Sequence, residues 1–255
     1  MIDVTQMAGL ACVFMRMTGC ILFNPIFGRR NFPTMFRVAM TLVLTIMIVT
    51  YSNVTVDFGT GTFIETCIIL LREFMIGFAM GTVVWLFMYV VILAGAFVDL
   101  QMALSMAQMY DPQSNVQMSV SSTYLNLMFM FAFFGMNAHL TLIHMFLNSA
   151  EIVPYGEASI MNPALSMHIL DVFCQCTILG LKMAMPIAGM LFITQMGVGI
   201  LMKTVPQINA FVVMLQVKIL AGLFMLAVVF SPLSNVIENL ITMLFQAVGG
   251  VLLFM

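Results

Sequence analysis

The chain has 255 residues, of which 63% are hydrophobic and 7% are charged, and its mean hydropathy is +1.13. Roughly a quarter of the residues of a soluble domain are charged, so this chain lacks the polar surface that a water-soluble enzyme needs. Eight Lys and Arg against ten Asp and Glu leave a net charge of −2, which argues against binding to nucleic-acid phosphates. The composition predicts an all-α, polytopic membrane protein with long helices and helical hairpins.

Apolar segments separated by turn signals recur along the chain, as expected of membrane-spanning helices. Such a helix needs about 20 mostly apolar residues, and clusters of Pro, Gly, Asn and Asp mark the connections. The longest segment is roughly twice a membrane span, which predicts either one long helix or a tight hairpin. The expected segments are 7–27, 38–50, 63–109, 124–147, 172–202, 210–230 and a last one that ends at Met255.

The most polar uncharged stretch of the chain follows the 63–109 segment. The run Asp-Pro-Gln-Ser-Asn at 111–115 is a strong turn signal, and a Ser and Thr cluster at 119–123 extends it. Short polar side chains of this kind favour turns over helix interiors. We therefore expect a loop at this point.

Ionisable residues inside the apolar segments include Arg16, Arg72, Glu73, Asp99 and Lys182. A charged group at membrane depth costs about 2.5 to 3.5 kcal/mol, so each of them needs a partner or water. Arg72 and Glu73 are neighbours and point about 100° apart on a helix, so each is expected to pair across helices. Structural pairing between helices or subunits is the favoured interpretation, while a water-filled path and proton coupling stay open.

No catalytic or metal-binding motif is visible in the sequence. It has no Gly-x-Ser-x-Gly elbow, no phosphate-binding Gly loop and no His-Glu-x-x-His. Its five cysteines lie in apolar stretches, where a thiol behaves as a small buried hydrophobe. We expect no enzymatic activity, cofactor or metal. The spacing Glu73-x-x-x-Gly77-x-x-x-Gly81 instead places two small residues on one helix face, which allows close helix packing in membranes.

A series of motifs extends in order over most of the chain. They are Pro25-x-Phe27-Gly28 with Pro33 and Arg37, Glu73-x-x-x-Gly77-x-x-x-Gly81, Gly95-x-x-x-Asp99-x-Gln101-Met102-x-Leu104-Ser105-x-Ala107, Asp111-Pro112-x-Ser114, Asn137-x-His139-Leu140, Pro186 and Gly199-x-Leu201-x-Lys203-x-x-Pro206-Gln207-x-Asn209-x-Phe211. Together they resemble the FliR family, the R/T-type subunit of the flagellar and type III secretion export apparatus. The stretch 101–112 looks more flagellar than injectisome-like, and Ala103 stands where many relatives have Gly.

The resemblance implies a non-enzymatic gate subunit in the bacterial inner membrane, within the flagellar basal body. With FliP-type and FliQ-type subunits it would form a closed helical pore through which unfolded flagellar proteins are exported, and it would contact the FlhB-type switch protein. The implied parts are a P-subunit-like region at 1–185, with a pore-plug loop at about 106–123, and a Q-subunit-like hairpin at 186–255.

Candidate functional residues fall into three groups. The resemblance places the plug at Met106, Met109, Tyr110, Asp111, Pro112, Gln113, Ser114, Asn115 and Met118. The candidates for subunit packing and buried charge are Arg16, Arg72, Glu73, Gly77, Gly81, Asp99, Gln101 and Lys182. The resemblance places the contact with the cytoplasmic switch protein at Lys203, Pro206, Gln207 and Asn209.

Two other classes of protein stay open at this stage. A proton- or ion-coupled secondary transporter would use Glu73, Asp99 and Lys182 at half-membrane depth. A purely structural membrane scaffold would tolerate the loss of residues 110–118 with no change in membrane permeability.

Overall fold

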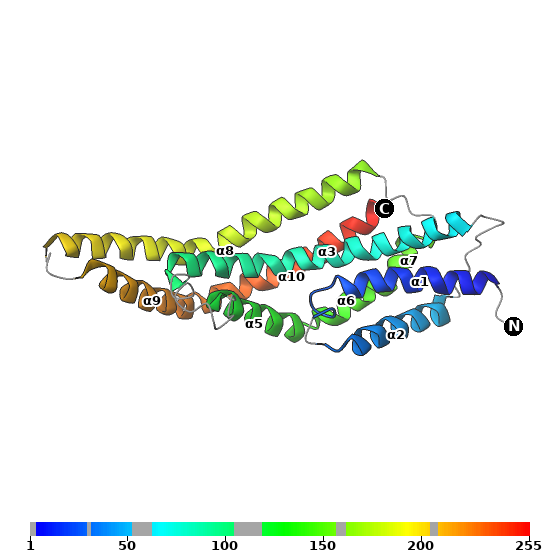
Figure 1. The fold of residues 1–255 in the computed structure, drawn as a ribbon, viewed down its shortest axis with the longest axis horizontal. Helices are drawn as coiled ribbons and strands as arrows, with labels where there is room; N and C mark the ends of the chain where they lie inside the picture. The colour runs from blue at the N-terminus through cyan, green and yellow to red at the C-terminus, as the bar shows by residue number, and fades with distance from the viewer. Residues whose placement is uncertain (1–3, 30–31, 53–62, 105–118, 157–161, 205–208) are drawn as a thin grey trace. The chain divides into compact units, whose positions relative to one another are not determined.

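The computed structural model describes residues 4–29, 32–52, 63–104, 119–156, 162–204 and 209–255, whose regular structure is α-helical throughout. The all-α prediction is confirmed for this part of the chain. In chain order (Figure 1) the helices are α1 Val4–Leu22, α2 Thr34–Ser52, α3 Phe63–Gln101, α5 Val120–Gly135, α6 Ala138–Leu147, α7 Ser149–Ile152, α8 Pro163–Thr204, α9 Ala210–Val228 and α10 Phe230–Leu253.

Five helices of the described part are long and apolar enough to cross a membrane, and the bent pair of α5 with α6–α7 would make a sixth span. The five are α2 over 34–51, α3, α8, α9 over 211–228, and α10. Their burial differs widely: 61% of the α3 span is buried inside the chain, against 11% of the α9 span. The polytopic membrane prediction is therefore confirmed for the described residues.

The 63–109 segment forms a single helix, α3, which ends at Gln101. The hairpin alternative is therefore wrong, and the helix is shorter than the apolar pattern suggested. It stops because Ala103 adopts a positive φ of 60°, the left-handed conformation that commonly terminates an α-helix. Residues 105–109 of the predicted segment lie outside the described part.

Local chain geometry corrects two further boundaries. The expected 124–147 span is two helices, α5 and α6, and α5 is bent by 68° against α6–α7. Asn137 sits at the break with φ 56° and ψ 24°, a conformation that Asn adopts more readily than most residues. The helix expected from 172 begins at Pro163, where the Asn162 side chain accepts a 3.0 Å hydrogen bond from the Ala164 N–H and caps the first turn.

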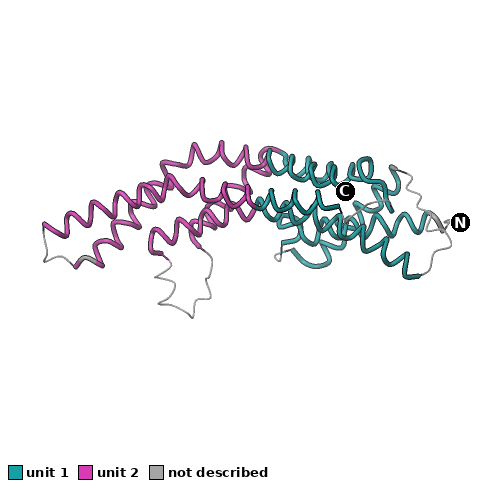
Figure 2. Tube along the Cα trace, turned by 90° about the horizontal axis from the view of Figure 1, so that it is seen from above, with its two compact units in different colours: residues 1–87, 137–173, 242–255 teal, residues 88–136, 174–241 magenta. Residues whose placement is uncertain are grey.

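The chain divides into two compact units, each assembled from separate stretches of sequence (Figure 2). Unit 1 comprises residues 1–87, 137–173 and 242–255, and unit 2 comprises residues 88–136 and 174–241. The expected join near Pro186 lies within the continuous helix α8, in the unit 2 part. The division into P-like and Q-like regions stays a prediction.

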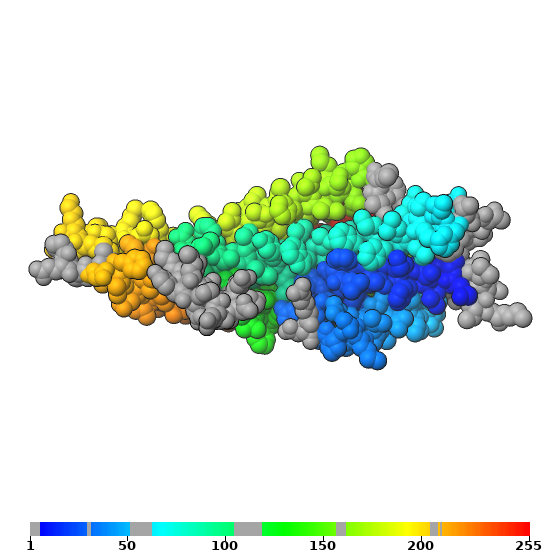
Figure 3. All heavy atoms as spheres, in the orientation of Figure 1, coloured from blue at the N-terminus to red at the C-terminus, as the bar shows by residue number. Residues whose placement is uncertain are grey.

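In unit 1, α1 lies between α2 and α3 (Figures 1 and 3). Glycines allow α1 and α3 to meet backbone to backbone. A Cβ added at Gly19 would lie 2.7 Å from the Phe78 nitrogen, and one at Gly77 would lie 2.8 Å from the Cys20 nitrogen. Since backbone atoms cannot rotate away, only glycine fits at these crossings. The close approach brings the polar side chains of α1 and α3 within reach of one another.

Candidate functional site

A buried ion pair joins α1 to α3 in unit 1. Arg16 Nε donates a 2.7 Å hydrogen bond to Glu73 Oε2, and both side chains have no exposed surface. Arg72, the sequence neighbour of Glu73, is exposed. Glu73 thus pairs across helices within the same chain. Because a lone buried charge is costly, the two residues must be placed together as the unit folds.

The same pair also holds the corner that follows α7. Arg16 Nη1 donates to the carbonyl oxygens of Val153 at 2.9 Å and Ser149 at 3.3 Å, and Glu73 Oε1 accepts from the Gly156 N–H at 2.8 Å. The Arg16 guanidinium carbon lies 4.1 Å from the centre of the Tyr155 ring, a cation–π contact. We call Arg16, Glu73 and these four corner residues the charge cluster.

Tyr155 contributes to the charge cluster as a neutral group. Burial raises the pKa of its phenol to about 12, so it stays protonated at physiological pH. Its hydroxyl and Arg16 Nη2 are buried with no hydrogen-bond partner among the described residues. The remaining donors and acceptors of the pair are satisfied within unit 1, which is the signature of a structural tie.

Gly77 and Gly81, the small residues of the sequence motif, both contact α1 of the same chain. Gly77 faces the backbone of Arg16 and Cys20, and a Cβ at Gly81 would lie 3.1 Å from the Phe23 Cβ. The motif therefore sets the close crossing that lets Glu73, one turn earlier on α3, reach Arg16.

A second polar site joins the end of α3 to the start of α5 in unit 2. The two carboxylate oxygens of Asp99, a buried residue, accept hydrogen bonds from the Ser121 N–H at 3.2 and 3.3 Å. Ser121 lies in the first turn of α5, where free N–H groups and the helix dipole favour a negative charge. Asp99 therefore caps a helix that begins beyond the 105–118 stretch.

Two further contacts fix the same first turn of α5. Ser122 Oγ donates a 2.7 Å hydrogen bond to the Ile92 carbonyl, and Gly95 lies directly against the backbone of Ser121 and Ser122. We call Ile92, Gly95, Asp99, Met102, Ser121 and Ser122 the α3–α5 junction. Gly95 and Asp99 are one helical turn apart, so both face α5.

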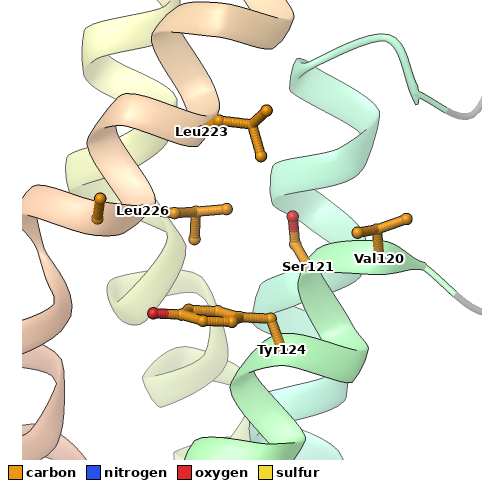
Figure 4. A pocket seen from close by; sticks show the side chains of 6 residues that line it. Val120, Ser121, Tyr124, Leu223 and Leu226 are labelled. Carbon is orange, nitrogen blue, oxygen red and sulfur yellow. The ribbon is translucent and has the colours of Figure 1, made fainter.

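Met102 links the junction to α9. Its side chain is fully buried, its sulfur lies 3.9 Å from Ser121 Oγ, and it fills the space that a side chain at Gly222 of α9 would need. Beside it, a cavity of about 210 Å³ separates α5 from α9 (Figure 4). Its lining residues are Val120, Ser121, Tyr124, Leu223, Leu226 and Ala227. Met102 thus packs tightly against α9 at Gly222, whereas a cavity lies between α5 and α9.

The candidate plug residues, Met106 to Met118, lie outside the described part of the chain. The described flanks are informative: the chain leaves the α3–α5 junction at Leu104 and re-enters it at Ser119, the N-cap of α5. The 105–118 stretch is therefore flanked by junction residues on both sides, with Asp99 and Met102 before it and Ser121 and Ser122 after it.

The remaining candidates lie on surfaces. Gln101 is half-buried at the end of α3, and Lys182 is exposed on α8. Lys203 is exposed in the last turn of α8, and Asn209 is the exposed N-cap residue of α9. Pro206 and Gln207 lie outside the described part. Glu73 belongs to unit 1, whereas Asp99 and Lys182 belong to unit 2.

Sequence reasoning missed the residues that complete the two sites. Tyr155, Ser149 and Val153 act largely through ring faces and backbone carbonyls, which carry no sequence signal. Gly19 and Gly222 could have been suspected as small residues in apolar helices, but only the structure shows what approaches them.

The structure defines a polytopic, helical membrane protein whose buried polar groups serve to hold helices together. The family model described as bacterial export proteins, family 1, matches residues 7–244, so the chain belongs to this family, the FliR family of the flagellar and type III secretion export apparatus. The predicted resemblance is confirmed.

The two FliR relatives compared first match nearly the full length of the chain. The flagellar biosynthetic protein FliR of Bacillus subtilis is 27% identical over 244 residues, which cover 94% of this chain and 93% of that protein. FliR of Escherichia coli is 23% identical over 238 residues, covering 93% and 90%. The surface presentation of antigens protein SpaR of Salmonella typhimurium is 25% identical over 183 residues, covering 71% and 67%. The chain is thus a membrane-type member of a bacterial export protein family, and these relatives are not named as enzymes.

Replacing Ala103 with Gly should stabilise the protein by about 1 kcal/mol, because an L-residue with a side chain is disfavoured at a φ of 60°. Ala96→Gly, in the interior of α3, should instead destabilise the protein by up to about 1 kcal/mol. Thermal denaturation midpoints of the two variants, purified identically, check the opposite signs. An equal fall of the thermal midpoint in both variants would show that the backbone of Ala103 is not strained.

Proposed function

We propose that this chain is the R-type subunit of the flagellar type III protein export gate. In this proposal it forms with FliP-type and FliQ-type subunits a closed helical pore in the bacterial inner membrane, at the flagellar basal body, and unfolded flagellar proteins leave through that pore. The observation that carries the proposal is the family match over residues 7–244, together with relatives named as flagellar biosynthetic proteins.

The distribution of apolar surface supports an assembled subunit. α9 leaves large side chains such as Phe211, Leu220 and Phe224 exposed, and α8 leaves Phe192 and Ile193 exposed. Extensive apolar surface of this kind must be covered by lipid or by other chains. We assign part of it to the P-type and Q-type neighbours, with residues 186–255 as the Q-like hairpin and 1–185 as the P-like region.

The contact with the FlhB-type switch protein is proposed at the connection between α8 and α9. Lys203 and Asn209 flank this connection and are exposed, so both are available to a partner. Pro206 and Gln207 complete the proposed contact.

Co-expression tests the assembly. The full-length chain is expressed in a bacterial membrane with and without its P-type and Q-type subunits, extracted in mild detergent, and analysed for mass and composition. We expect a discrete complex on co-expression only. A stable particle of this chain alone that transports ions or solutes, with uptake abolished by Glu73→Gln, would replace the gate with the secondary transporter.

Deleting residues 110–118 is expected to make the membrane leak ions, because these residues belong to the proposed plug of the closed pore. The measurement is the ion permeability of cells that express the deleted chain together with the other subunits. Deleting residues 157–161, another interhelical connection, is the matched control and should leave permeability unchanged. An intact barrier in the 110–118 deletion, with the complex still assembled, would favour the structural scaffold.

A further inference from the structure

Unit 1 also contains a cavity, and none of its lining residues belongs to the charge cluster. About 250 Å³ of space opens between the end of α2 and the α6–α7 corner; both elements are visible in Figure 1. Met47 and Ile48 are among its apolar residues, and its polar ones are Tyr51, His144, Asn148 and Glu151. This volume is smaller than the roughly 300 to 1,000 Å³ of pockets that hold drug-sized ligands, so it suits a small group attached to something larger.

The cavity lies where two candidate membrane spans end. The apolar span of α2 ends at Tyr51, and the bent span formed by α5 and α6–α7 ends at Ile152. Tyr51 is 92% exposed, and tyrosines gather at the level of lipid headgroups because the ring is apolar and the hydroxyl is polar. The polar part of the cavity is therefore at the headgroup level.

An apolar track leads from the cavity along α2. Met47, Ile46, Val43 and Leu42 are all exposed and follow the helix toward its amino-terminal end. An acyl chain can lie on this face while its headgroup occupies the cavity, so one molecule accounts for both the apolar and the polar lining.

The charge of the cavity selects the kind of headgroup. Glu151 is exposed and is the lining residue with a formal charge. The sequence has no Lys or Arg from 38 to 71 or from 73 to 181, the stretches that contain every lining residue. The nearby Arg16 guanidinium, which donates to the Ser149 carbonyl, is neutralised by Glu73. The Glu151 carboxylate therefore sets the charge of the lining, which attracts a cation and repels an anionic headgroup.

We propose that this cavity binds the headgroup of phosphatidylethanolamine, with the primary ammonium at Glu151 and an acyl chain along α2. A primary ammonium offers three N–H donors, which the Glu151 carboxylate and the Asn148 amide oxygen accept. His144 and Tyr51 carry donors suited to the phosphate. The inference requires only that the chain is embedded in a membrane, so it stands or falls separately from the export-gate proposal.

Lipid titration followed by native mass spectrometry tests the inference. The full-length chain is extracted with the subunits that accompany it, and phosphatidylethanolamine and phosphatidylglycerol are added in turn. We expect roughly fivefold tighter binding of phosphatidylethanolamine, the factor that one partly exposed ion pair supplies. Glu151→Gln should abolish this preference, and Glu238→Gln, the same change at an exposed site on α10 outside the cavity, should keep it.

A second variant and a mapping step locate the lipid. Met47→Trp fills the cavity without changing its charge and should reduce binding as much as Glu151→Gln. Phosphatidylethanolamine with a photoreactive acyl chain should crosslink to the peptide that contains residues 42–51. Equal binding of the two lipids would overturn the proposal. So would a preference for phosphatidylethanolamine that survives both variants, or a photoreactive lipid that does not crosslink to residues 42–51.

Discussion

Replacing Glu73 with Ala is expected to destabilise the protein by about 3 to 5 kcal/mol, because it leaves the Arg16 guanidinium charged, fully buried and without its carboxylate. At roughly 2 to 4 °C per kcal/mol for a chain of this size, the thermal midpoint should fall by about 10 °C. The measurement is the denaturation midpoint of the extracted complex, together with the amount of chain that accumulates in the membrane.

Two controls separate the effect of losing the Arg16–Glu73 ion pair from the effect of any substitution in this part of α3. Arg72→Ala removes an exposed charge from the adjacent residue and should change stability by no more than about 0.5 kcal/mol. The double variant with Met at both 16 and 73 removes both charges and should recover most of the loss. The recovery is incomplete, because the Val153 carbonyl and the Gly156 N–H lose their partners. The loss in the double variant is compared with the losses in Arg16→Met and Glu73→Met measured singly. If the double variant lost as much stability as the sum of the two single variants, the ion pair would not be the cause.

The charge cluster shows where prediction from sequence ends. Composition alone identifies Arg16 and Glu73 as charges that need partners, since apolar segments rarely tolerate them. Their pairing joins residues 57 positions apart, and the single-sequence pattern carries no distance information of that kind. The carbonyls of Ser149 and Val153 are invisible to sequence reasoning, because any residue supplies the same group.

Helix existence was predictable and helix ends were less so. Hydropathy locates most of the long helices because the bilayer demands about 20 apolar residues from each. It cannot locate the break at Asn137, where a single residue in the left-handed conformation divides a continuous apolar run. It likewise extends α3 past Gln101, since the stop at Ala103 is a backbone conformation that apolarity does not report. The plug residues rest on resemblance alone.

Gly95→Ala is expected to destabilise the protein by about 3 kcal/mol, even though Ala is the better helix former. The added Cβ would lie 2.6 Å from the Ser121 carbonyl carbon and closer still to the backbone of Ser122, and backbone atoms have no rotamer to escape into. The start of α5 must therefore move away from α3. That movement also weakens the Asp99 hydrogen bonds to Ser121, so export of flagellar proteins should fall together with stability.

Gly189→Ala is the matched control for this substitution, because it makes the same chemical change in α8 of the same unit, where nothing lies within 4 Å of the new Cβ. There the helix propensity acts alone and should stabilise the protein by up to about 1 kcal/mol. Thermal midpoints and secreted flagellin are measured for both variants. Asp99→Asn should give a smaller loss than Gly95→Ala, of about 1 to 2 kcal/mol, since it weakens the cap without displacing α5. If both Gly variants were stabilising, α5 would not dock on α3 as described, and the residues that bracket the 105–118 stretch would lie elsewhere.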